Sequence, residues 1–85
     1  MRSAPRRNPR ASPRKREQLI DDTMDRYIMW RERAAAVRVA YEACAGVRTR
    51  IERSTAYGAL NAALDQEQRA AEEYAAFLAH VTRVV

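Results

Sequence analysis

The sequence predicts an all-α fold, an antiparallel hairpin of two helices with coiled-coil character. From Glu17 to the last residue there is no proline, and glycine occurs only at Gly46 and Gly58. The same stretch is dominated by alanine, leucine, arginine and glutamate, which are good helix formers. Apolar residues also recur at heptad spacing on both sides of Gly46, a pattern typical of paired helices. We therefore expect one small helical domain.

Residues 1–16 differ in composition from the rest of the chain. They carry seven basic side chains and no acidic one, whereas residues 17–85 carry nine arginines and eleven acidic residues. The net charge of +5 therefore originates in this segment. Pro5, Pro9 and Pro13 disfavour a helix and favour an extended chain. We predict a disordered basic tail over residues 1–16.

The first helix is predicted over residues 17–45. Its acidic residues gather in its first turns, where they suit the positive end of the helix dipole. Asp22 and Arg26 are spaced for an ion pair four residues apart. The heptad a series reads Ile20, Tyr27, Ala34 and Tyr41. The d series reads Thr23, Trp30, Val37 and Cys44.

The turn is predicted over residues 46–49. Gly46 suits the left-handed residue that often follows a helix C-terminus. Thr49 and Glu52 are spaced as a capping box, in which each side chain binds the backbone N–H of the other residue. So short a connection favours antiparallel neighbours.

The second helix is predicted over residues 50–83. Its d series contains one charged residue, Glu67, and the sequence leaves open whether Glu67 pairs with Arg31 or Arg38. Gly58 marks a bend or a close approach, or has no structural role. The a series reads Tyr57, Leu64, Ala71, Leu78 and Val85. The d series reads Leu60, Glu67, Tyr74 and Val81.

The apolar stripe is wider than one partner helix can cover, because further apolar residues flank the heptad positions. We expect two hairpins to pair into a four-helix bundle, or one hairpin to bind another helical protein. Eight large residues are predicted to form a buried seam that is also the self-association face. This predicted seam consists of Tyr27, Trp30, Val37, Tyr41, Leu60, Leu64, Tyr74 and Leu78.

The sequence contains no catalytic, cofactor or metal signature. His80 is the only histidine, and Cys44, the only cysteine, reads as a small buried thiol. Phosphate-binding loops, Cys-x-x-Cys pairs and calcium loops are absent from the sequence. No run approaches the roughly 18 apolar residues of a membrane span. We expect a cytoplasmic protein without enzymatic activity, small-molecule substrate or membrane attachment.

The segment REQLIDDTMDRYIMWRERAAAVRVAYEAC resembles the first helix of the small all-helical chorismate mutases. Arg16 and Arg33 match two substrate-binding arginines of that family in spacing, and Glu32-Arg33 matches its Glu-Arg pair. Cys44 stands where the family has a catalytic lysine. Without that cation the negative charge that develops on the rearranging ether has no partner. We therefore expect no mutase activity.

The function predicted from these patterns is that of a helical interaction module that associates through its heptad face. The alternative is a nucleic-acid-associated accessory protein whose basic tail binds phosphates without sequence preference. A tail that only increases solubility explains the composition equally simply. The residues of the candidate nucleic-acid arm are Arg2, Arg6, Arg7, Arg10, Arg14, Lys15 and Arg16.

Overall fold

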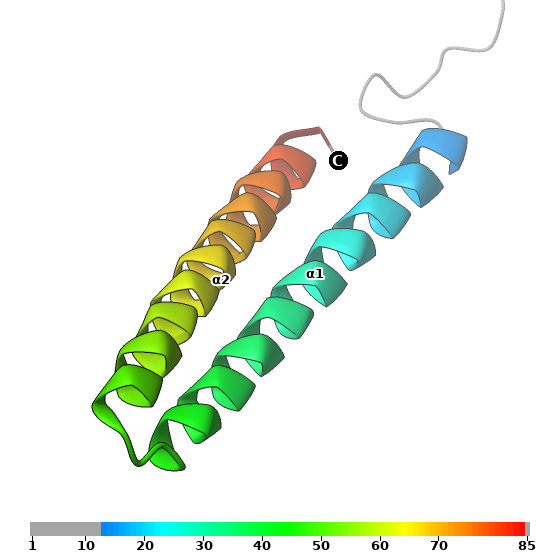
Figure 1. Ribbon diagram of the computed structural model, residues 1–85. Coiled ribbons are helices and arrows are strands. Elements are labelled where there is room, and N and C mark those ends of the chain that lie inside the picture. Colours follow the sequence, from blue (N-terminus) through cyan, green and yellow to red (C-terminus); the bar gives the residue numbers. More distant parts are fainter. Residues whose placement is uncertain (1–12, 85) are drawn as a thin grey trace, which may run out of the picture.

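The computed structural model describes residues 13–84, which form two α-helices joined by a short turn (Figure 1). Helix α1 spans Pro13–Ala45 and helix α2 spans Arg50–Val84. The helices run antiparallel and pack against each other side by side (Figure 1). The predicted all-helical hairpin is confirmed.

Helix α1 begins four residues earlier than predicted, at Pro13. Proline is tolerated in a first helical turn, because its missing N–H would have no helical partner there and its φ angle is already helical. The first turn contains cations and no acid. The expected role of the acidic residues at this helix end is therefore wrong, since they lie further along α1. Residues 1–12 of the predicted tail lie outside the described residues.

The end of α1 does not use a left-handed glycine. Neither Gly46 nor any other described residue has a positive φ angle. Instead, the Gly46 N–H donates to the Ala43 carbonyl at 3.3 Å, and the Val47 N–H donates to the Cys44 carbonyl at 3.5 Å. These bonds span three residues and tighten the last turn, so they satisfy the terminal carbonyls without a left-handed residue.

The capping box at the start of α2 is confirmed. The Glu52 N–H donates to Thr49 Oγ1 at 3.1 Å, and Glu52 Oε2 accepts the Thr49 N–H at 3.5 Å. The same carboxylate oxygen also accepts the Arg48 N–H at 3.3 Å. One glutamate thus satisfies two backbone donors of the turn, and this explains why α2 begins at Arg50.

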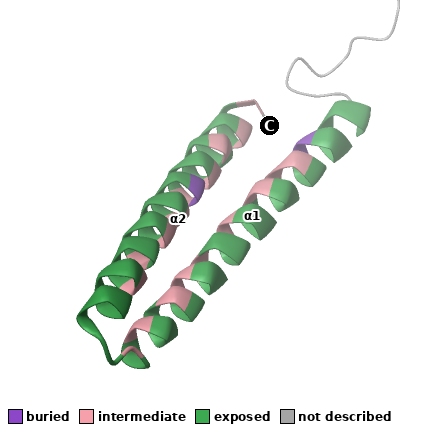
Figure 2. Cartoon of the chain, viewed as in Figure 1, coloured by how far each residue is buried: buried purple, intermediate pink, exposed green. Residues whose placement is uncertain are grey.

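The core between the helices is thin. Among residues 13–84 only Leu19 and Ala70 are buried, with 9% and 7% of their surfaces exposed, and half-buried residues line the rest of the contact (Figure 2). The centre of the contact is the predicted d series of both helices, every member of which is half-buried. These residues are Thr23, Trp30, Val37 and Cys44 of α1 and Leu60, Glu67, Tyr74 and Val81 of α2.

The second row of the contact differs from the predicted a series. In α1 it includes Leu19, Arg26 and Ala40, each of which directly precedes an exposed a residue. In α2 it consists of the residues before the a positions, and all of them are buried or half-buried. They are Ala56, Ala63, Ala70, Phe77 and Val84.

The physical reason is the width of the apolar stripe. On α2 it covers three adjacent rows, and one neighbouring helix covers two of them; on α1 the second contact row also contains Arg26. Alanine at positions 56, 63 and 70 lets α1 approach closely on that side, whereas the a row of α2 offers the larger side chains of Tyr57 and Leu64. The helices therefore pack on the row with the smaller residues and leave the a row at the edge.

Candidate interaction face

An aromatic cluster occupies the middle of the contact between the helices. The rings of Trp30 and Tyr74 are stacked, with centroids 5.6 Å apart and an angle of 19° between their planes. Tyr27 lies edge-on to Trp30 at 6.1 Å and tilted against Tyr74 at 5.6 Å. The two rings of α1 thus pack against the one ring of α2.

Glu67 contacts this cluster and neither of the arginines considered for it. Its Oε1 atom accepts a hydrogen bond from the Trp30 indole N–H at 2.9 Å. An indole N–H that is partly buried needs an acceptor, and Glu67 supplies it across the helix contact. The interruption of the apolar stripe is therefore explained by the tryptophan opposite.

Arg26 also bridges the helices. Its guanidinium lies over the Phe77 ring, 4.0 Å from the centroid, in the geometry of a cation–π interaction. Its Nη1 atom donates to the backbone carbonyl of Asp22 at 3.1 Å, so the hydrogen bond goes to the main chain and not to the carboxylate that the sequence suggested. Further toward the turn, Arg33 Nη1 donates to Gln66 Oε1 at 3.1 Å.

The eight residues of the predicted seam divide into two groups. Four of them, Trp30, Val37, Leu60 and Tyr74, are half-buried between the helices. The other four are exposed, so within a single chain the expectation of a seam buried throughout is wrong. The exposed fractions are 38% for Tyr27, 68% for Tyr41, 44% for Leu64 and 39% for Leu78.

The exposed members belong to the a series of each helix, which we call the outer row. Each outer-row residue lies about 100° further round the helix than the residue before it, which except before Ala34 belongs to the second contact row. Because the helices are antiparallel, this rotation takes both outer rows to the same side of the hairpin. The outer row consists of Ile20, Tyr27, Ala34 and Tyr41 of α1 and Tyr57, Leu64, Ala71 and Leu78 of α2.

Two hollows confirm that the outer rows of α1 and α2 share one side. At the turn end, Tyr41 and Tyr57 line the same hollow. At the open end of the hairpin, Ile20 and Leu78 line another. The outer rows and the residues that line these hollows with them form one surface, which we call the outer face.

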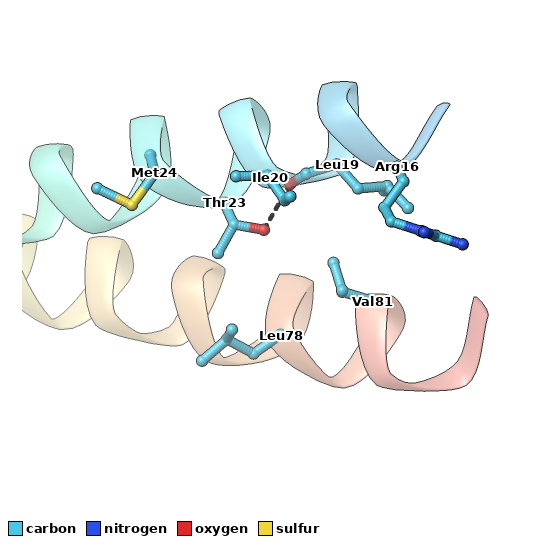
Figure 3. A pocket seen from close by; sticks show the side chains of 7 residues that line it. All are labelled: Arg16, Leu19, Ile20, Thr23, Met24, Leu78 and Val81. Atoms are coloured by element: carbon cyan, nitrogen blue, oxygen red, sulfur yellow. Dashed lines mark hydrogen bonds between the residues drawn. The ribbon is translucent and has the colours of Figure 1, made fainter. Parts of the chain in front are cut away.

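The hollow at the open end is apolar, with a volume of about 340 Å³ (Figure 3). Its lining includes one hydroxyl group, that of Thr23, which donates to the Leu19 carbonyl at 2.6 Å and is therefore satisfied. Arg16 lies at the margin of the hollow (Figure 3). The other lining residues are Leu19, Ile20, Met24, Leu78 and Val81.

The opposite side of the hairpin is polar in comparison. A hollow of about 210 Å³ there is lined by Asp25 and Glu73 together with Arg26, Met29 and Ala70. The two sides of the molecule thus differ in chemical character, and the larger apolar surface belongs to the outer face.

The predicted seam omitted several residues of the outer face. Ile20 and Tyr57 belong to the a series and could have been found from heptad position alone. Met24 lies outside both heptad series, among the apolar residues that flank them, and it lines the hollow of Figure 3.

The remaining sequence candidates are dispersed. Of the candidate nucleic-acid arm, Arg14, Lys15 and Arg16 lie exposed in the first turn of α1, and the other four arginines lie outside the described residues. Cys44 is a half-buried free thiol, and the His80 ring is exposed, 5.9 Å from that of Phe77. Within residues 13–84 no three potential metal ligands gather at one site. Neither described helix has a stretch long and apolar enough to cross a membrane.

Comparison with known proteins returned no match among protein-family models, curated proteins or solved structures.

Proposed function

We propose that this protein is a non-enzymatic helical interaction module that self-associates, or binds another helical protein, through its outer face. The observation that carries the proposal is the exposure of the larger outer-row residues on one side of both helices. Tyr41, Tyr57 and Leu64 expose 68%, 52% and 44% of their surfaces, although their heptad positions are those of core residues.

The thin core supports the same proposal. A helix that contacts one neighbour buries two rows, whereas a helix in a four-helix bundle has two neighbours and buries a wider stripe. Each helix here has a third apolar row. A further pair of helices placed on the outer face would cover these rows and add apolar burial worth about 25 cal/mol for each Å² removed from water.

The shape of the outer face suits a helix. Its large residues repeat every seven positions, and smaller residues such as Ala34 and Ala71 alternate with tyrosine and leucine. A neighbouring helix with apolar residues at the same spacing can place its side chains between them.

The experiment compares Tyr41→Glu with Val39→Glu. Both residues lie on α1 and are almost equally exposed, at 68% and 67%, but Val39 lies off the outer face. A charge at position 41 should abolish association measured by sedimentation equilibrium, whereas the same charge at position 39 should leave association close to that of the wild type. Equal association of Tyr41→Glu and wild-type protein would contradict the proposal.

A second candidate function is nucleic-acid binding, and one observation favours it. Arg14, Lys15 and Arg16 occupy the first turn of α1, where the helix dipole is positive and where anions are stabilised. The cations therefore reinforce an attraction for phosphate.

The test replaces all three residues by glutamine in the full chain and measures duplex binding over a range of salt concentrations. If the residues contact phosphates, the log–log salt slope should become shallower by about 0.9 for each lost contact. Arg48, Arg50 and Arg53, exposed near the turn, provide a matched triple glutamine control. Equal slopes for the two triple variants would count against this function.

A further inference from the structure

Two charged pairs flank the outer face in the same periodicity. On α1, Arg31 and Arg38 line a hollow together with Glu32 and with Tyr27 and Ala34 of the outer row. On α2, Asp65 and Glu72 directly follow the outer-row residues Leu64 and Ala71. Each pair is separated by seven residues, so its two members lie on the same side of their helix.

These arginines lack partners within the hairpin. Among residues 13–84, no side chain forms a hydrogen bond or an ion pair with Arg31 or Arg38, and the same holds for Asp65. Glu72 accepts a bond from its own helix, from Gln68 Nε2 at 3.0 Å. Near the middle of the hairpin, Arg31 and Arg38 thus border the outer face on α1, and Asp65 and Glu72 border it on α2.

We infer that the outer face binds a second copy of this chain with both turns at the same end, so that α1 of each copy packs antiparallel on α2 of the other. In this arrangement Arg31 and Arg38 of one copy meet Glu72 and Asp65 of the second copy. The inference rests on the proposed function and specifies its partner and orientation.

Two-fold symmetry allows two ways to place the outer faces of two hairpins together. With the axis along the hairpin, the turns lie at the same end and α1 covers α2 of the other copy. With the axis across the hairpin, the turns lie at opposite ends, and each helix covers its own counterpart.

The level of each residue along the hairpin follows from contacts between the helices. Trp30 bonds to Glu67, Arg33 bonds to Gln66, and Tyr27 packs on Tyr74. The numbers of residues at the same level therefore add to about 100, with a rise of about 1.5 Å per residue.

The same-end arrangement preserves these levels between copies. Arg31 then lies about three residues from the level of Glu72 of the second copy, and Arg38 lies about three residues from the level of Asp65, which is about 4.5 Å along the axis. An arginine side chain is long enough to span this distance. Both offsets are equal, so the two pairs are equally within reach in both symmetry-related contacts of the dimer.

The opposite-end arrangement brings like charges together. Arg31 lies near the middle of α1, so the two copies of Arg31 would approach each other where α1 covers α1. Asp65 and Glu72 lie on either side of the middle of α2, so each would approach the other acid across the interface. Like charges facing each other oppose binding.

At the middle of the hairpin the apolar rows fit both arrangements, because tyrosine or leucine meets alanine there in either. In the same-end arrangement, Tyr27 lies opposite Ala71 of the second copy and Leu64 lies opposite Ala34. The charges therefore select the orientation.

The test is a charge exchange between two chains. One chain carries Arg31→Glu and Arg38→Glu, and the other carries Asp65→Arg and Glu72→Arg. Each chain alone presents like charges at both contacts of the same-end dimer, so its dissociation constant should rise at least about tenfold. An equimolar mixture restores opposite charges at both contacts, and it should associate within about threefold of the wild-type affinity.

A matched control reverses two exposed arginines away from the outer face, Arg48→Glu in the turn and Arg83→Glu on α2. This chain should associate like the wild type. If both charge-exchange chains also do so, or if their mixture shows no recovery, the orientation is wrong. The effect of Tyr41→Glu decides separately whether the outer face is the interface.

A distance measurement gives an independent readout. Spin labels on Arg48→Cys, in a chain that also carries Cys44→Ala, mark the turn of each copy. The same-end dimer should give a distance of about 20–30 Å, within the width of a four-helix bundle whose helices are about 10 Å across. Labels about 50 Å apart, the length of one helix, would overturn the inference. A wild-type chain that remains monomeric at a concentration of about 100 µM would overturn it as well.

Discussion

The Trp30 indole N–H donates to Glu67 Oε1 at 2.9 Å, and this bond joins the two helices at the middle of the hairpin. Trp30 also stacks on Tyr74, which lies in the same row of α2 as Glu67. The bond and the stacking fix the axial level of α1 against α2, because a shift by one heptad would separate all three residues.

Loss of the acceptor should destabilise the hairpin. Glu67→Ala leaves the partly buried Trp30 N–H without a protein partner and should cost about 1–2 kcal/mol. Glu67→Gln retains an acceptor oxygen and should cost less, because it loses the charge assistance alone. Urea unfolding followed by Trp30 fluorescence, at one fixed chain concentration, measures both. Glu42→Ala, an exposed glutamate of α1, is the control and should change stability by at most about 0.5 kcal/mol.

A larger residue at position 70 should separate the helices. Ala70 has 7% of its surface exposed, and Ala70→Leu would place three additional carbons at this buried position between the helices. We expect a loss of about 1–3 kcal/mol in the free energy of unfolding. Ala79→Leu adds the same group at an exposed position of α2 and should be close to neutral. Equal effects of the two changes would show that the helices do not pack on this row.

Gly58 should be replaceable with a gain in stability. A Cβ atom at position 58 would have no neighbouring atom within 4 Å, so alanine has room. Because glycine is about 1 kcal/mol less favourable than alanine inside a helix, Gly58→Ala should raise the free energy of unfolding by about that amount. A loss of stability would indicate a close approach at this position in an assembled state.

Gly46→Ala tests the end of α1. Gly46 has no positive φ angle, and a Cβ atom there would contact the Ala43 carbonyl oxygen at an ordinary 3.9 Å. Alanine should therefore be tolerated, with a change of at most about 0.5 kcal/mol in thermal or urea unfolding. A loss of about 1 kcal/mol or more would point to the left-handed conformation that the sequence suggested.

The capping box should contribute measurably to α2. Thr49→Ala removes the acceptor for the Glu52 N–H, which is bound at 3.1 Å, and should cost about 1 kcal/mol. Thr55→Ala, at an exposed position within α2, is the control and should not destabilise, because alanine is the better helix former. Similar losses for both variants would argue against a role of the cap.

The helices, the turn and the capping box could be predicted from the sequence, because they depend on local chemistry. Proline and glycine placement, heptad spacing and the Thr49–Glu52 pair act over a few residues and need no distant contact. The same local reasoning missed the helical role of Pro13, where a breaker of helix interiors is suited to a first turn. It also assigned Gly46 a left-handed conformation that the tightened last turn makes unnecessary.

The partner of Glu67 and the division of the apolar stripe depended on the tertiary structure. The sequence offered Arg31 and Arg38 for Glu67, and only the antiparallel packing brought the Trp30 N–H to it. It also contained three apolar rows on α2 without indicating which two would face the neighbour. Small residues such as Ala63 and Ala70 decided this, because closeness of approach depends on both helices at once. The sequence alone thus determined which residues are apolar and helical, whereas tertiary packing determined that Tyr41 and Leu64 remain exposed on the outer face.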